Sequence, residues 1–113
     1  DIRRAKTYNM ILVDPPKFGR GPEGETWDLF TDLPEFLKGC AELLDKNDAH
    51  MVLTVYAIRA STLAFRQLLQ ETLRARAGHY QTGELAIAES GVTGGKDTGR
   101  MVPTSLYTRW SSR

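Results

Sequence analysis

The sequence predicts an α/β fold with the element order β-α-β-α-β-β. Residues 8–14 and 50–56 are nearly continuous in apolar residues, which is typical of parallel strands buried on both faces. Residues 32–44 and 61–76 carry apolar residues at helical spacing. Because a strand, a helix and a second parallel strand form a right-handed unit, the two apolar runs should lie side by side in one sheet.

The composition is that of an ordinary globular domain. The 113 residues are 41% hydrophobic and 26% charged, and the net charge of +1 is too small to indicate nucleic-acid binding by itself. The single cysteine, Cys40, excludes an internal disulfide and a cysteine-based zinc site and is compatible with a reducing compartment. We expect no bound metal and a cytoplasmic location. No apolar run approaches the roughly 20 residues that span a bilayer, so no membrane partner is expected.

The first strand is expected over residues 8–14 and ends in Asp14, which two prolines follow. Pro15 keeps Asp14 out of the helical region, and neither Pro15 nor Pro16 has an N–H group to donate. The Asp14 carboxylate and the proline carbonyls should therefore form a stiff row of hydrogen-bond acceptors. Such a row suits the amino edge of a nucleobase, on which Phe18 could stack. The alternative is a strand that simply stops at a proline turn.

Residues 17–31 are expected to form an irregular loop, because three glycines and a proline interrupt them. Lys17 and Arg20 would bring positive charge to a passing phosphate backbone. Trp27 and Phe30 are apolar, so part of this loop should pack on the body of the domain. The alternative is a mobile, solvated loop.

The first helix is expected over residues 32–44, with Asp32 as the N-cap and Pro34 in the first turn. Cys40 falls on the apolar stripe of this helix. Its position indicates a buried structural thiol rather than a nucleophile.

The second strand, residues 50–56, should place Tyr56 beside Asp14, since the carboxyl ends of parallel strands meet at one edge of a sheet. Arg59 should lie over the same edge. The side chain of His50, at the opposite end of this strand, should be structural.

The rest of the chain predicts a helix and an antiparallel strand pair. The helix is expected over residues 61–76, begun by Ser61 or Ala60 and stopped by Gly78. Residues 79–89 and 100–110 should form the last two strands, joined by a flexible glycine-rich loop. No helix follows this loop to offer N–H groups, so it does not fit a phosphate-binding loop.

The sequence Asp-Pro-Pro-Lys-Phe-Gly at residues 14–19 resembles the fourth motif of class I S-adenosylmethionine-dependent methyltransferases. It is most similar to the ribosomal RNA methyltransferase-like branch, and so is its continuation to Trp27. Residues 56–59, 83–85 and 106–107 match that branch more loosely. The resemblance implies that residues 1–113 are a single partial domain: the carboxyl-terminal half of a Rossmann-like class I methyltransferase fold, with a parallel pair and a terminal antiparallel hairpin.

The resemblance implies methyl transfer from S-adenosylmethionine to a base of RNA, in particular ribosomal RNA. It implies catalytic roles for Asp14, Pro15, Pro16 and Phe18, and substrate-binding roles for Lys17, Arg20, Tyr56 and Arg59. No cysteine follows the second strand or the Asp-Pro-Pro motif, as it often does in enzymes that methylate carbon five of cytosine. This departure argues against a cysteine adduct, and a nitrogen acceptor needs mainly to be positioned.

Half of the expected enzyme is not in this sequence. No Gly-x-Gly-x-Gly follows a strand near the start, and the family's ribose-binding acidic residues also lie upstream. We therefore expect the chain alone to bind cofactor poorly and to be inactive. The missing amino-terminal half or another chain should cover the edge of the first strand. Two alternatives remain: a methyltransferase that acts on a protein or small molecule, and a non-catalytic α/β interaction domain without cofactor.

Overall fold

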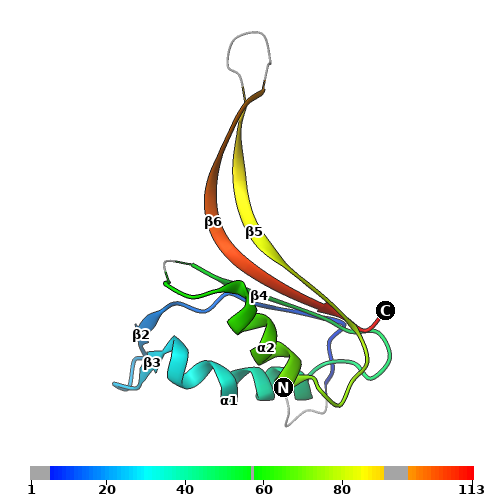
Figure 1. Cartoon of the computed structure of the whole chain (residues 1–113). Coiled ribbons are helices and arrows are strands. Elements are labelled where there is room, and N and C mark those ends of the chain that lie inside the picture. The colour runs from blue at the N-terminus through cyan, green and yellow to red at the C-terminus, as the bar shows by residue number, and fades with distance from the viewer. Residues whose placement is uncertain (1–5, 57, 91–96) are drawn as a thin grey trace.

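The computed structural model describes residues 6–56, 58–90 and 97–113. Within them, a four-stranded mixed sheet has the strand order β1-β4-β6-β5, and a smaller sheet consists of β2 and β3. Both helices lie on one face of the larger sheet (Figure 1). The elements are β1 (Met10–Val13), β2 (Phe18–Arg20), β3 (Thr26–Asp28), α1 (Leu29–Glu42), β4 (His50–Val55), α2 (Thr62–Thr72), β5 (His79–Ser90) and β6 (Asp97–Ser111).

The two apolar runs lie side by side and parallel, as the sequence predicted. Met10 of β1 is opposite His50 of β4, and Val13 is opposite Leu53. The α/β fold class is therefore confirmed, and the residues that follow β1 and β4 emerge at the same edge of the sheet.

The hydrophobic core lies between the sheet and the two helices. Met51, Leu53 and Val55 alternate along β4 and are buried, whereas the intervening residues are only half-buried. Their partners in the core come from α1, α2 and β6: Leu29, Leu33, Leu37, Phe65, Leu69 and Trp110. None of the described helices is long and apolar enough to cross a membrane.

Helix α1 begins earlier than the sequence predicted, and its N-cap is Asp28 rather than Asp32. The Asp28 carboxylate accepts the backbone N–H of Phe30 at 3.3 Å, and the Asp32 carboxylate accepts the backbone N–H of Asp28 at 2.7 Å. This reciprocal pair satisfies two donors at the helix start. The prediction was wrong because two carboxylates one turn apart can both cap, and the upstream one takes the N-cap position.

The segment predicted as an irregular loop contains a small hairpin. Strands β2 and β3 are antiparallel, with Phe18 opposite Asp28 and Arg20 opposite Thr26. Gly24 has a φ of 84°, a conformation that glycine adopts without strain. The loop prediction was wrong here because the glycines permit the reversal of a hairpin rather than preventing regular structure.

Helix α2 is capped as predicted, but it ends before Gly78. The Ser61 hydroxyl accepts the backbone N–H of Leu63 at 3.1 Å, and the helix stops at Thr72. A Cβ at position 78 would collide with the Trp110 indole nitrogen and lie 2.6 Å from a backbone carbonyl oxygen. The predicted stop at Gly78 was therefore wrong, and a glycine is needed there because Trp110 packs against its backbone.

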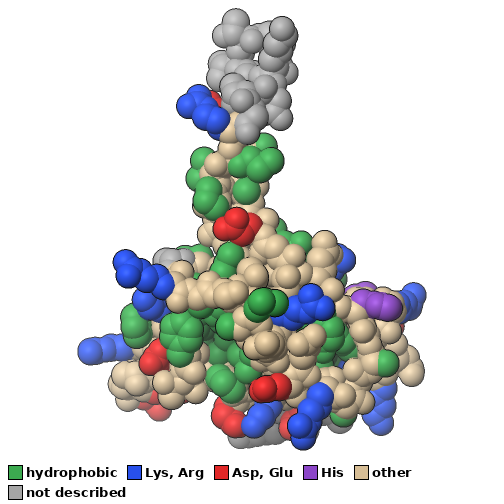
Figure 2. All heavy atoms as spheres, in the orientation of Figure 1, with side chains coloured by type: hydrophobic (Ala, Val, Ile, Leu, Met, Phe, Trp, Pro, Cys, Tyr) green, Lys and Arg blue, Asp and Glu red, His purple; other side chains and the backbone are tan. Residues whose placement is uncertain are grey.

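Strands β5 and β6 are antiparallel, as predicted, and continue beyond the sheet as a long curved arm (residues 85–90 and 97–105; Figure 1). Leu85 pairs with Ser105 and Ala86 pairs with Pro103, so Thr104 is the extra residue of a β-bulge. Hydrophobic side chains are exposed along the arm (Figure 2). Most of the expected glycine-rich loop, residues 91–96, lies outside the described residues.

Candidate functional site

The candidate site is the carboxyl edge of the parallel pair, where Asp14 follows β1. The Thr54 hydroxyl of β4 donates a hydrogen bond to one Asp14 carboxylate oxygen at 2.6 Å. None of the described residues is bonded to the other oxygen, and Asp14 is exposed. The contact holds the carboxylate at the sheet edge while leaving one oxygen free to accept a hydrogen bond from a ligand.

Thr54, rather than Tyr56, is the residue of β4 that contacts Asp14. Val13 pairs with Leu53, so the residue after each of them points to the same, helix-free face of the sheet. Tyr56 lies beyond the end of β4 and is exposed. Asp14 therefore lies opposite Thr54, and Tyr56 follows two residues later in the chain. The lone hydroxyl in an apolar strand was the signal that could have identified Thr54.

The two proline carbonyls do not form the expected row of free acceptors. The Trp27 indole N–H donates to the Pro16 carbonyl at 2.7 Å, and the Trp27 ring meets Phe36 of α1 edge to face at 5.7 Å. Pro16 is therefore a fixed corner that the β2–β3 hairpin holds against the body. The Asp14 carboxylate remains as an exposed acceptor, whereas Pro15 is buried as a whole residue.

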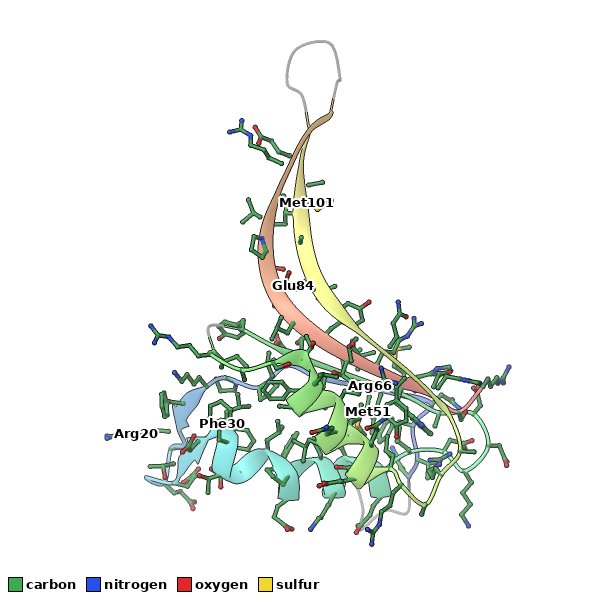
Figure 3. All side chains as sticks on the ribbon, viewed as in Figure 1. Arg20, Phe30, Met51, Arg66, Glu84 and Met101 are labelled. Carbon is green, nitrogen blue, oxygen red and sulfur yellow. The ribbon has the colours of Figure 1, made fainter. Side chains whose placement is uncertain are left out.

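Phe18, which was predicted to be catalytic, and two residues predicted to bind substrate, Lys17 and Arg20, are all exposed. The Phe18 ring is 66% exposed, and the Lys17 ammonium lies 5.5 Å from its centroid, within cation–π range. Arg20 ends β2 and points outward at the same end of the molecule (Figure 3). Arg59 is also exposed, in the connection between β4 and α2. The segments that follow β1 and β4 thus carry exposed positive charge and an open aromatic face.

One face and one edge of β1 are open in the described residues. Leu12 is 70% exposed and Met10 is 55% exposed, because both point away from the helices. Among the described strands, β1 pairs with β4 alone, so no described strand lies along its outer edge. A mainly apolar pocket of about 290 Å³ follows this edge from Ile11 to Pro16. Exposed apolar residues beside an unpaired strand are typical of a surface that another segment covers.

Cys40 is buried in α1, as the sequence predicted. Burial raises the pKa of its thiol, because the charged thiolate is poorly solvated there. A protonated, buried thiol is a weak nucleophile. The only cysteine of the sequence is therefore not placed for covalent catalysis.

Several solved structures resemble this chain. The SAM-dependent methyltransferase from Agrobacterium tumefaciens is 47% identical, with a TM-score of 0.89, over 98% of this chain and 35% of that protein. SMU.776, named as a methyltransferase and solved in complex with SAH, is 17% identical with a TM-score of 0.65 over 96% of this chain and 27% of its own. A structure named as a SAM-dependent methyltransferase from Streptococcus mutans is 15% identical, with a TM-score of 0.60, over 96% of this chain and 27% of its own.

The two structures of 17% and 15% identity resemble this chain in fold alone, whereas the Agrobacterium protein resembles it in both fold and sequence. The chain spans only about a third of the Agrobacterium protein, so it has the fold of part of a Rossmann-like methyltransferase domain. No model of a protein family matches the sequence, and no curated protein matches it either.

Proposed function

We propose that this chain is the carboxyl-terminal half of the catalytic domain of an S-adenosylmethionine-dependent methyltransferase that acts on a base of RNA, in particular ribosomal RNA. The observation that carries the proposal is the 47% identity to the Agrobacterium SAM-dependent methyltransferase over 98% of the chain. The free Asp14 oxygen at the carboxyl edge of the parallel pair supports it.

Each candidate residue has a role in this proposal. Asp14 and the Pro15 carbonyl accept the polar hydrogens of the acceptor base and orient its reacting atom toward the methyl group. Pro16 keeps this corner in place through its bond from Trp27. Phe18 stacks on the base, and the remaining four residues contact the RNA: Lys17, Arg20, Tyr56 and Arg59.

The described residues fit only the acceptor side of a cofactor site. S-adenosylmethionine, when bound, supplies an electrophilic methyl group on its sulfonium. Within residues 6–56, 58–90 and 97–113, no glycine-rich turn joins a strand to a helix, and the three glycines after Asp14 belong to the β2–β3 hairpin and its approach. The surfaces that hold the nucleoside of the cofactor must therefore come from the rest of the protein.

A nitrogen of the base is the acceptor that this chain serves best. Attack through carbon five of cytosine uses a cysteine adduct, and the only cysteine here is buried with a raised thiol pKa. A ring or amino nitrogen carries its own electron pair and needs no covalent help from the protein. Positioning by Asp14 and Pro15 is sufficient for such an acceptor.

The upstream part of the full-length protein covers the open side of β1, including Met10 and Leu12. The isolated chain should therefore bind S-adenosylmethionine with a Kd above about 1 mM, whereas the full-length protein should bind it at least about 100-fold more tightly. Isothermal titration calorimetry of both proteins measures this difference. Micromolar binding by residues 1–113 alone would show that the cofactor site is complete without an upstream half.

The substrate class is tested with the full-length protein and radiolabelled S-adenosylmethionine. Ribosomal RNA from cells that lack the gene should take up label, and digestion to nucleosides should place the methyl group on a base nitrogen. Ribosomal RNA from wild-type cells is the control and should take up little label, because its site is already methylated. Label in a protein or small-molecule fraction would reject the RNA substrate, and no transfer to any fraction would reject the activity.

A further inference from the structure

A second pocket lies where the arm leaves the sheet, beside the carboxyl end of β4. It has a volume of about 290 Å³ and is polar. Its walls come from three places in the chain: Tyr56 and Ile58 after β4, Glu84 of β5, and Thr104 and Ser105 of β6. Glu84 lies at the base of the arm (Figure 3).

The β-bulge of the arm shapes this pocket. Thr104 is the extra residue, and its hydroxyl donates to the Leu85 carbonyl at 2.9 Å. Bulges bend a strand and re-aim side chains, and they are common beside active sites. Here the bulged residue and its neighbour Ser105 both line the pocket, opposite the end of β4.

Glu84 is the distinctive chemical group of the pocket. None of the described residues forms a hydrogen bond or ion pair with its carboxylate, whereas Glu89, further along β5, is paired with Arg100 at 2.7 Å. The carboxylate can only accept hydrogen bonds, so it suits a ligand that presents N–H donors. Its negative charge repels phosphate, so the pocket does not suit a phosphate group.

The acceptor position and the pocket both involve residues at the carboxyl end of β4. Thr54 holds Asp14, and Tyr56, two residues further on, lines the pocket. Bases in single-stranded RNA can be splayed apart and read on their edges. Two neighbouring bases of one strand could then enter the two sites, one beside Asp14 and the other beside Glu84.

We propose that this second pocket receives the base next to the methylated one, and that Glu84 selects a base with an amino group. Adenine, cytosine and guanine each carry such a donor, and uracil does not. The apolar side chain of Ile58 and the ring of Tyr56 supply the contact surface for the flat base. This inference rests on the proposed RNA substrate.

The test uses the full-length protein and four probes: AMP, CMP, GMP and UMP. Calorimetric or NMR titration of the wild type should show at least one amino-bearing nucleotide binding about tenfold more tightly than UMP. The Glu84→Gln variant should bind that nucleotide about tenfold more weakly and lose the preference over UMP. Glu71→Gln, at an exposed position of α2, is the matched control and should behave as the wild type.

The outcomes separate this inference from the proposed function. Equal binding of all four nucleotides by the wild type, no binding of any, or an unchanged preference in Glu84→Gln would each overturn the pocket assignment, even if the protein methylates RNA. A preference that depends on Glu84, in a protein that methylates no RNA, would support the pocket and reject the proposed activity. Circular dichroism of Glu84→Gln should match the wild type, because the replaced side chain is exposed and unpaired.

Discussion

Replacing Asp14 with alanine in the full-length protein should lower the rate of methyl transfer by about 100-fold or more. The substitution removes the free carboxylate oxygen that we assign to the acceptor base. Its other oxygen accepts only the Thr54 hydroxyl among the described residues, and both side chains are accessible to water. Folding should therefore survive, because water can replace the lost hydrogen bond. Single-turnover transfer from labelled S-adenosylmethionine measures the rate, and far-UV circular dichroism measures the fold.

Glu42→Ala is the matched control for this experiment. It removes an exposed carboxylate at the end of α1, away from Asp14, and should leave the rate unchanged. Asp14→Asn keeps the shape of the side chain while replacing one acceptor oxygen with a donor, so it should also be slow. Normal transfer by Asp14→Ala would remove Asp14 from the acceptor site. A loss of rate together with a loss of ellipticity would mean that Asp14 is structural.

Replacing Trp110 with alanine should lower the free energy of unfolding by about 3–5 kcal/mol. Trp110 is 0% exposed and lies opposite Met51 of β4. The Arg76 guanidinium lies over the Trp110 ring, 4.9 Å from its centroid. This guanidinium also donates hydrogen bonds to the backbone carbonyls of Asp45 and Lys46. Alanine would leave a cavity under the sheet and remove the aromatic face beneath that cation.

Ile87→Ala is the control for the Trp110 substitution. Ile87 lies on the arm and is 64% exposed, so its truncation should cost no more than about 1 kcal/mol. Urea unfolding followed by far-UV circular dichroism compares the two variants without relying on tryptophan fluorescence. A similar loss of unfolding free energy in Trp110→Ala and Ile87→Ala would contradict the position of Trp110 in the core.

Local chemistry in the sequence determined the main elements and their order. The two apolar runs became neighbouring parallel strands, as predicted. The predicted burial on both faces was wrong in the described residues, because both helices cover the same face of the sheet and Met10 and Leu12 on the other face are exposed. Ser61 capped α2 as expected, since its hydroxyl reaches an N–H only two residues away. The buried place of Cys40 followed from its spacing on the apolar stripe of α1.

Only the tertiary structure decided which side chains meet at the site. Thr54 contacts Asp14 across 40 positions of sequence, and Trp27 binds the Pro16 carbonyl across 11. Both contacts depend on strand register and on the placement of a hairpin, which no local pattern encodes. Composition and spacing act over a few residues, whereas a site is made by segments that packing brings together. The pocket beside Glu84 is an example, since its walls come from the end of β4, from β5 and from the bulged part of β6.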